Sequence, residues 1–170
     1  GDHGKWGYVD ARGVFVIQPA WESAQAFQGE VAVVTQGGRW GLVNRAGKQT
    51  VAPQFEFVKG HAHGEFFDGM ALAFRDGKYG FVDQQGNIAV EPMFDLAGDF
   101  GEGLALVEIN GAYGYIDKAG KLVIMPKFED AGVFSDGLAQ VRINGKWGYI
   151  NTDGQVAIPA AFDSATPFRD

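Results

Sequence analysis

The sequence contains no cysteine and few basic residues, and each scarcity excludes a class of protein. Without thiols there are no disulfides and no thiolate metal sites, and the redox compartment stays open. The 14 basic residues stand singly among 21 acidic ones, which leaves a formal net charge of −7 and no basic stripe for phosphates. We therefore expect no nucleic-acid partner. No apolar run approaches the length of a membrane span, so we expect no membrane insertion.

Glycine, by contrast, is abundant, and five of the 26 glycines directly follow a Trp or Tyr residue. The pairs are Trp6-Gly7, Trp40-Gly41, Tyr79-Gly80, Tyr113-Gly114 and Trp147-Gly148. Their spacings of 34, 39, 34 and 34 residues are typical of a tandem repeat. Five residues inserted before Phe66, which takes the place of Phe27 in the first copy, explain the one longer step. The repeat predicts a single domain over 1–170, with copies at approximately 1–30, 31–69, 70–103, 104–137 and 138–170.

Each copy contains two kinds of turn signal between runs of β-forming residues. Asn110-Gly111 is typical of a type I′ hairpin turn, and the Asp-x-x-Gly run at 117–120 of a three-residue loop with a bulge. These turns predict about three antiparallel strands per copy, at 104–109, 112–117 and 121–125 in the fourth. We interpret the next stretch, 128–134, as either a helical turn or a loop. The predicted fold class is all-β, with five tandem β-meander repeats of about 34 residues.

The hairpin register predicts how the copies pack. A two-residue turn at 110–111 pairs Val107 with Gly114 and Glu108 with Tyr113, so one face of the hairpin is small and the other bulky. We expect bulky faces to stack on small faces, with each aromatic ring lying over the glycine of a neighbouring copy. The glycine would then be required by close approach.

These motifs together resemble a known family. The run Gly-Lys-Trp-Gly-Tyr-Ile at 145–150, the Asp/Asn-x-x-Gly turn, Pro-x-Phe-Glu/Asp and Phe-x-x-Gly-Leu-Ala resemble the bacterial WG (KWG) repeat family. The resemblance covers essentially the whole chain, although two of the five copies have Tyr in place of Trp. It implies propeller-like or solenoid-like β repeats, often appended to other bacterial domains, and it implies no common activity.

Two architectures fit the pattern, a closed propeller-like ring and an open curved array. Three strands in 34 residues are fewer than an ordinary propeller blade has, and five second strands stand beside only four first strands. A ring would close only with an incomplete seam. An open array would leave an edge at the first copy, where strand addition or self-association is expected.

The insertion is the one local departure from the repeat, and it supplies the candidate site residues. His61, His63 and Glu65 point the same way on an extended segment, and their side chains are reasonable ligands for Zn, Ni or Cu. The competing interpretation is a solvated loop. Phe67 is a candidate binding residue beside His61 and His63, because Phe66 already fills a repeat position.

Two repeated residue types also allow two interpretations. The acid that follows each aromatic, such as Glu56, could form a ring that holds a cation, or could cap a turn in every copy. The Trp and Tyr residues could stack on sugars, or pack between copies.

No nucleophile motif and no phosphate loop occurs, so we expect neither an enzyme nor a cofactor. The predicted function is a non-enzymatic scaffold that binds a protein or peptide on the loop face that carries the insertion, or at the uncapped edge of the array. The alternatives are a glycan or cell-envelope binding module with exposed aromatic residues, and a metal site at the insertion.

Overall fold

The computed structural model describes residues 4–60 and 63–164, and in this part the chain is entirely β, with 17 strands and no helix that could cross a membrane. The first sheet pairs β1 (Trp6–Val9) with β2 (Phe15–Trp21). The second contains β3 (Ser23–Ala24), β4 (Val31–Gln36), β5 (Arg39–Asn44) and β6 (Gln49–Phe55). The third contains β7 (Met70–Arg75), β8 (Lys78–Asp83) and β9 (Ile88–Phe94). The fourth contains β10 (Leu96–Ala97), β11 (Ala105–Ile109), β12 (Ala112–Ile116) and β13 (Leu122–Phe128), and the fifth β14 (Asp130–Ala131), β15 (Leu138–Ile143), β16 (Lys146–Asn151) and β17 (Val156–Phe162).

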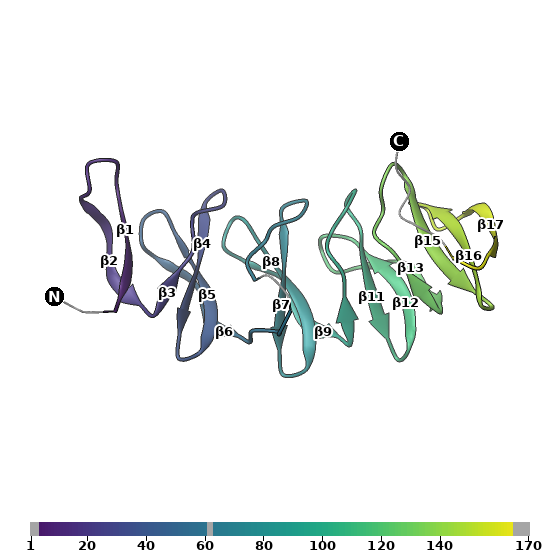
Figure 1. Cartoon of the computed structure of the whole chain (residues 1–170), viewed down its shortest axis with the longest axis horizontal. Helices are drawn as coiled ribbons and strands as arrows, with labels where there is room; N and C mark the ends of the chain where they lie inside the picture. Colours follow the sequence, from purple (N-terminus) through teal and green to yellow (C-terminus); the bar gives the residue numbers. More distant parts are fainter. Residues whose placement is uncertain (1–3, 61–62, 165–170) are drawn as a thin grey trace.

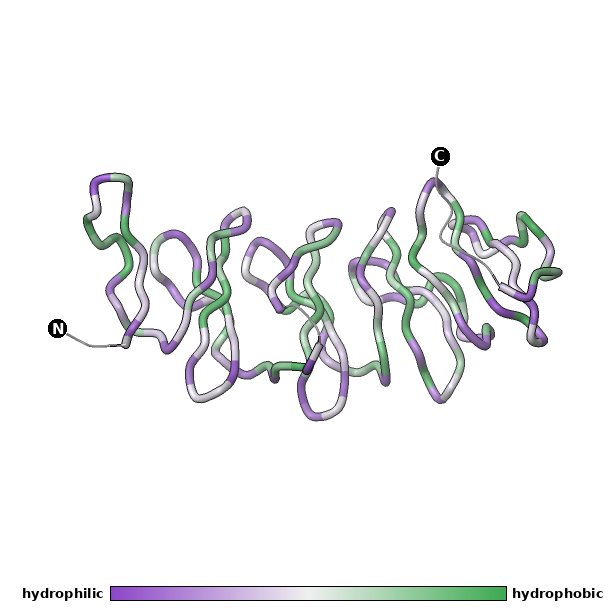
Figure 2. The backbone as a smooth tube through the Cα atoms, viewed as in Figure 1, coloured by the Kyte–Doolittle hydropathy of each residue, from purple (hydrophilic) through white to green (hydrophobic). Residues whose placement is uncertain are grey.

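The five sheets follow one another in a row, and the first and last sheets lie at opposite ends of an elongated molecule (Figure 1). Of the two architectures that the repeat allows, the chain therefore adopts the open array. Hydrophobic residues run along the strands, and most hydrophilic residues lie at the turns between them (Figure 2). Each sheet can bury its faces only against its neighbours, as in other stacked-repeat proteins.

Both predicted turns are present. Asn110 and Gly111 have φ angles of 52° and 83°, as a type I′ turn requires. At 117–120, the backbone N–H of Gly120 donates to the carbonyl of Asp117 at 3.0 Å, and the Asp117 side chain accepts hydrogen bonds from Ala119 and Lys121. The same side-chain pattern recurs at Asp10, Asn44, Asp83 and Asn151.

A third turn was not predicted. Glu102-Gly103 forms a two-residue turn with φ angles of 53° and 81°, closed by pairing of Gly101 with Leu104. It connects a short strand to the first long strand of the sheet. The stretch 128–134 is accordingly neither a helical turn nor a loop alone, because it contains β14, which pairs with β15. We call β3, β10 and β14 the short first strands.

The hairpin register is as predicted, with Val107 opposite Gly114 and Glu108 opposite Tyr113. The expected reason for the glycine is wrong, however. A Cβ on Gly114 would lie 2.5 Å from the carbonyl oxygen of Ile124 and 2.7 Å from the nitrogen of Pro126. Both atoms belong to β13 of the same sheet, so the glycine makes room for a neighbouring strand and not for an aromatic ring of another copy.

An irregularity in the third strand causes this close approach. Tyr115 pairs with Ile124 and Tyr113 with Phe128, so β13 uses four residues where β12 uses two. Pro126 lies inside this irregularity, on the outermost strand of the sheet. The strand was predicted to end before the proline, but it continues to Phe128 because the bulge frees the proline from a ladder hydrogen bond.

The stacking of bulky faces on small faces is confirmed at the level of the sheets. Between the third and fourth sheets, Phe81 and Phe94 of the bulky face pack with Ala105 and Val107 of the small face. Equivalent clusters fill the other three interfaces between sheets. Aromatic pairs recur in three of the four interfaces, as Tyr8–Phe27, Phe81–Phe100 and Tyr115–Phe134, with ring centroids 4.6 to 4.8 Å apart.

Hydrogen bonds also connect one copy to the next. The carboxylate of Asp68 accepts from the backbone N–H of Gly103 at 2.7 Å, and that of Glu102 accepts from Gly137 at 3.0 Å. Lys118 forms an ion pair with Asp68 at 3.2 Å. Because both hydrogen bonds join residues 35 positions apart, these two contacts recur from one copy to the next.

Candidate functional site

The third sheet differs from the second, fourth and fifth in its first strand. Within the described residues it has three strands, because the insertion stands where a short first strand is expected. The segment before the insertion pairs as in the other copies, because the backbone N–H of Glu56 donates to the carbonyl of Phe74 at 2.8 Å. In the described part of the chain, pairing with β7 resumes only at the bridge between Phe67 and Met70. Within the described residues β7 is therefore an edge strand of its sheet.

The difference between the third sheet and the three regular sheets is clearest at the backbone carbonyl of Leu72. In the three regular sheets a carbonyl at the middle of the first long strand accepts a backbone hydrogen bond from the preceding segment. These bonds run from Gln25 to Val33, from Gly98 to Leu106 and from Gly132 to Gln140, at 2.9 to 3.0 Å. Leu72 occupies this position in the third sheet, and no described residue donates such a bond to it. We call this side of β7 the Leu72 edge.

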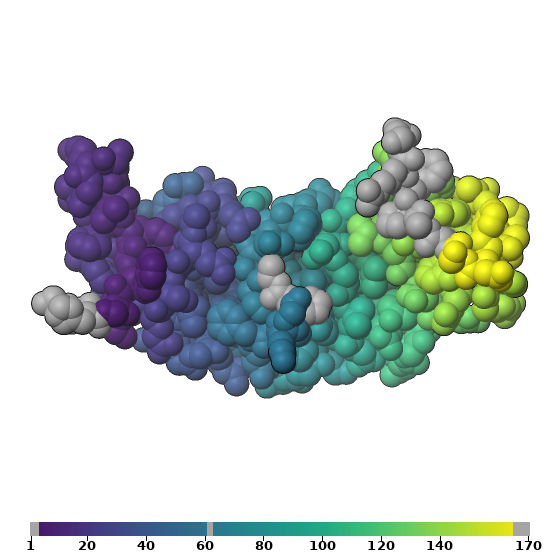
Figure 3. All heavy atoms as spheres, in the orientation of Figure 1, coloured from purple at the N-terminus to yellow at the C-terminus, as the bar shows by residue number. Residues whose placement is uncertain are grey.

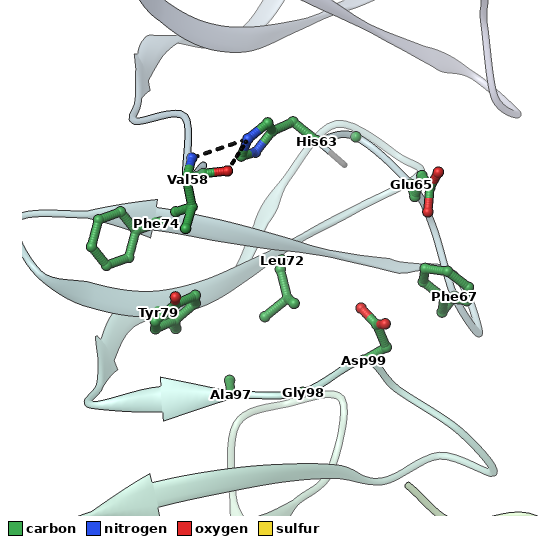
Figure 4. Close-up of a pocket in the computed structure, with 11 residues that line it drawn as sticks. Val58, His63, Glu65, Phe67, Leu72, Phe74, Tyr79, Ala97, Gly98 and Asp99 are labelled. Carbon is green, nitrogen blue, oxygen red and sulfur yellow. Dashed lines mark hydrogen bonds between the residues drawn. The ribbon is translucent and has the colours of Figure 1, made fainter. Parts of the chain in front are cut away.

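A pocket of about 200 Å³ lies beside the Leu72 edge. The strands contribute Leu72, Phe74 and Tyr79, and the next copy contributes the segment 97–99. The segment around the insertion forms the remaining side, with Val58, His63, Gly64, Glu65 and Phe67. In Figure 4 the Leu72 side chain points toward Ala97 and Gly98. The chain on either side of residues 61–62 lies midway along the array, on the face toward the viewer in Figure 3. The pocket is thus formed where the repeat is interrupted.

Three of the predicted site residues, His63, Glu65 and Phe67, line this one pocket. His61 lies outside the described residues. The structure places Phe66 against the core between the second and third sheets, while the side chain of Phe67 is 42% exposed. This is the placement that the repeat predicted for the two phenylalanines. The binding role of His61, His63 and Phe67 stays a prediction.

His63 holds the insertion together. Its Nε2 lies 3.0 Å from the backbone nitrogen of Val58 and 3.2 Å from the Val58 carbonyl oxygen (Figure 4). Its ring meets Phe57 edge-on, with centroids 4.9 Å apart. A metal ion at Nε2 would displace these backbone contacts. Within 4–60 and 63–164, no group of three His, Asp or Glu side chains is arranged to hold a metal. The metal site of His61, His63 and Glu65 stays a prediction.

The other end of the insertion is attached to the preceding sheet. The Gln28 side chain donates to the carbonyl of Gly64 at 2.5 Å. Gly64 has a φ of 76°, and a Cβ there would lie 2.3 Å from a methyl carbon of Val33. Only glycine satisfies both conditions, so this contact determines the direction in which Glu65 leaves the loop.

The repeated acid has a local role in each copy. Glu22, Glu56, Asp95 and Glu129 accept a hydrogen bond from the backbone N–H of a hairpin turn in the next sheet, at residues 37, 76, 110 and 145. The Lys78 ammonium, followed by the Asn110 N–H, lowers the pKa of the Asp95 carboxyl. The interpretation of these acids as a ring that holds a cation is therefore wrong, because the array is open and these four carboxylates cap turns.

The largest aromatic side chains serve mainly in packing. Trp40 and Tyr115 are fully buried and Trp21 nearly so, and the Tyr115 hydroxyl donates to the carbonyl of Gly132 at 2.7 Å. Burial raises the pKa of Tyr115 well above its usual value, and raises that of Tyr8 to about 12. Among the described Trp residues, Trp6 is the one with a largely exposed side chain, at 56%.

The sequence interpretation missed the residues that form the pocket floor and far wall, namely Leu72, Phe74, Tyr79 and the segment 97–99. A usable signal existed. The five inserted residues stand in the segment that supplies a short first strand in other copies, so they had to expose part of the following strand. That inference needs the short strand itself, which has only two residues and no pattern of its own.

The fold and the position of the site define the class of protein, an open all-β repeat array with one interrupted unit. Comparison with protein families agrees with this description. Five consecutive segments, 6–40, 40–79, 79–111, 113–147 and 147–170, match the family described as WG containing repeat. The chain belongs to the WG-repeat family. A search of curated proteins found no match.

Proposed function

We propose that this chain is a non-enzymatic repeat scaffold that binds a protein or peptide partner on the face of the insertion. One observation carries the proposal: the single interruption of the repeat coincides with a pocket of about 200 Å³. Elsewhere in the described chain, the interfaces between sheets are filled by apolar clusters. A rigid frame with one irregular loop face is a common arrangement for recognition.

The chemistry of the pocket suits a polypeptide. Leu72, Phe74 and Tyr79 make an apolar floor, while Glu65 and Asp99 add carboxylates at one end (Figure 4). No Lys or Arg lines the pocket. The preferred partner therefore combines an apolar or small residue with a basic one, in keeping with the net charge of −7.

The non-enzymatic part of the proposal is supported by the perturbed ionisable groups, which have structural causes. The backbone N–H of Val14 is the main reason that the pKa of Asp10 is lowered, and that of Gly103 has the same effect on Asp68. The three tyrosines with raised pKa values, Tyr8, Tyr113 and Tyr115, owe them chiefly to burial.

The alternatives concern the first sheet and the loop. Trp6, Phe15 and Val16 are about half exposed on the two-stranded first sheet, which favours this sheet for glycan stacking or self-association. Buried Trp40 and Trp21 do not favour glycan binding, so we rank it second. Metal binding at the insertion ranks third, and its test is thermal stabilisation by Zn²⁺ that is lost in His61→Ala.

Selection from a displayed peptide library against the purified chain tests the main proposal. We expect peptides whose affinity falls about tenfold in Phe67→Ala, as for a contact residue at an interface. The matched control is Phe162→Ala, which removes a phenylalanine of similar exposure on the last sheet. Peptides that bind both variants as tightly as the original chain would contradict the insertion face as the site, and failure to select any peptide would contradict the proposal itself.

A further inference from the structure

Three other sheets show what lies at the position equivalent to the Leu72 edge. In the second, fourth and fifth sheets, a two-residue strand and the residue after it lie along the first long strand. These segments are Ser23-Ala24-Gln25, Leu96-Ala97-Gly98 and Asp130-Ala131-Gly132. Each places alanine in the second position and donates a backbone hydrogen bond from the third. In the third sheet β7 is the equivalent long strand, and no short first strand lies beside it in the described chain.

The residue in the third position depends on the side chain opposite. Gly98 faces Leu106, and a Cβ on Gly98 would lie 2.9 Å from the Leu106 Cγ. Gly132 faces Gln140 and is more crowded still, with a Cβ 2.2 Å from the Gln140 amide. Gln25 is accommodated opposite the smaller Val33. Because Leu72 matches Leu106, a segment at the Leu72 edge needs glycine opposite it.

We propose that the Leu72 edge accepts an extended Ala-Gly segment of a partner as a short first strand, so that the partner completes the third sheet. The inference rests on the proposed function and specifies its partner. The partner's glycine N–H donates to the Leu72 carbonyl, as Gly98 does to Leu106. Backbone hydrogen bonds supply affinity, as in other cases of strand addition, and the fit of small residues supplies specificity.

Charge defines the ends of the segment. The exposed carboxylate of Glu65 lines the pocket, and Asp99 lies across from it on the next copy (Figure 4). A lysine beside the Ala-Gly pair would approach the exposed Glu65 carboxylate, whereas an acidic residue would be repelled by it. The partner segment is therefore basic, unlike the acidic chain that it joins.

A pair of synthetic peptides tests the backbone hydrogen bond. The first is Lys-Leu-Ala-Gly-Val-Lys with blocked ends, and the second replaces glycine by sarcosine, which removes the N–H and keeps the other groups. We expect the first to bind the chain in titrations followed by NMR, with shifts at Leu72, Ala73 and Ala97, and the sarcosine peptide to bind about tenfold more weakly. Equal binding of the two peptides, or no binding of the first at millimolar concentration, would overturn strand addition.

A loop variant provides the second test. It replaces residues 57–65 by Leu-Ala-Gly-Asp, the residues of 96–99, so that the chain supplies its own short first strand. We expect this variant to stay folded and to lose binding of the first peptide. The matched control places the same four residues at 130–133, where a short first strand already exists, and should bind normally.

The outcomes separate this inference from the proposed function. Library peptides that depend on Phe67 but bind the loop variant normally would overturn strand addition and leave the scaffold proposal standing. Absence of any selected peptide would overturn the scaffold proposal. Retained binding of the first peptide by the loop variant would overturn the Leu72 edge as its site.

Discussion

The third and fourth sheets contain the same hairpin register, the same aromatic-glycine pair and the same bulge in the last strand. The fourth has its short first strand, β10, and the third has the insertion in that place. The three long strands form equally in both sheets. The short first strand is therefore dispensable for the sheet, and without it β7 is left as an edge strand within the described residues.

The largest expected effect tests the part that both sheets share. Gly80→Val and Gly114→Val should each lower the free energy of unfolding by about 3 kcal/mol, because a Cβ would lie 2.3 or 2.5 Å from a carbonyl oxygen of the third strand. Chemical denaturation measures this. Gly111→Asn is the control, since Asn tolerates a positive φ and nothing lies within 4 Å of that position. A near-normal melting temperature for either valine variant would contradict the role of the bulge.

A smaller effect tests a difference between the two sheets. Tyr115→Phe should lower the free energy of unfolding by about 1 to 2 kcal/mol, because it leaves the buried Gly132 carbonyl without its donor. The third sheet has Phe81 in this position and lacks the hydroxyl. Tyr113→Phe, on the same strand but half-buried, is the control and should change stability little. Equal effects of the two substitutions would contradict a special role for the buried hydroxyl.

The loop variant at 57–65 sharpens the same comparison. It shortens the connection by five residues and adds a backbone hydrogen bond at Leu72, so it should raise the free energy of unfolding by about 1 kcal/mol. Thermal and chemical unfolding of the variant and the original chain measure the difference. A folded but less stable variant would mean that the insertion contributes contacts which the short first strand cannot replace.

The smallest effect concerns acid stability. The Gly103 N–H and Lys118 lower the pKa of Asp68, so the folded state binds fewer protons at this group than the unfolded state. Its contribution is present above about pH 4 and is lost as the pH falls through the folded pKa. Asp68→Asn should therefore flatten the acid limb of the stability curve and lower stability at pH 7 by a few tenths of a kcal/mol.

The control for this prediction is Asp136→Asn, at the same turn position in a later copy. Asp136 forms no ion pair within the described residues, so its replacement removes a carboxylate at the same turn position without removing an ion pair between copies. Parallel acid limbs for the original chain and Asp68→Asn would show that this link between copies does not contribute.

The sequence predicted the features that depend on neighbouring residues. Asn110-Gly111 and the Asp-x-x-Gly loop determined two turns, and the turns determined the register of the long strands. It could not distinguish a ring from an open array, because that choice depends on the angle between stacked sheets. The predicted reason why position 114 must be glycine was also wrong. Neither Gly114 nor Pro126 alone indicates that a bulge in β13 brings the two residues into close contact.

The candidate site was located only in part. The break in the repeat drew attention to His63, Glu65 and Phe67, which do share a pocket. Leu72 and Ala97 escaped notice because they look like ordinary repeat residues. These two residues line the pocket because the insertion replaces the short first strand beside Leu72. A periodic pattern shows the residues that each copy contains, and it does not show which neighbouring strand one copy lacks.

The open stacking of bulky face on small face imposes no closure condition. In a ring, each added unit changes the angle available to every other, so copy number is constrained by geometry. Here a duplicated stretch of one period adds one sheet and one interface wherever the duplication begins. Copy number in such an array can thus drift by unequal recombination without loss of foldability, and an insertion in one unit can diversify while its neighbours keep the frame.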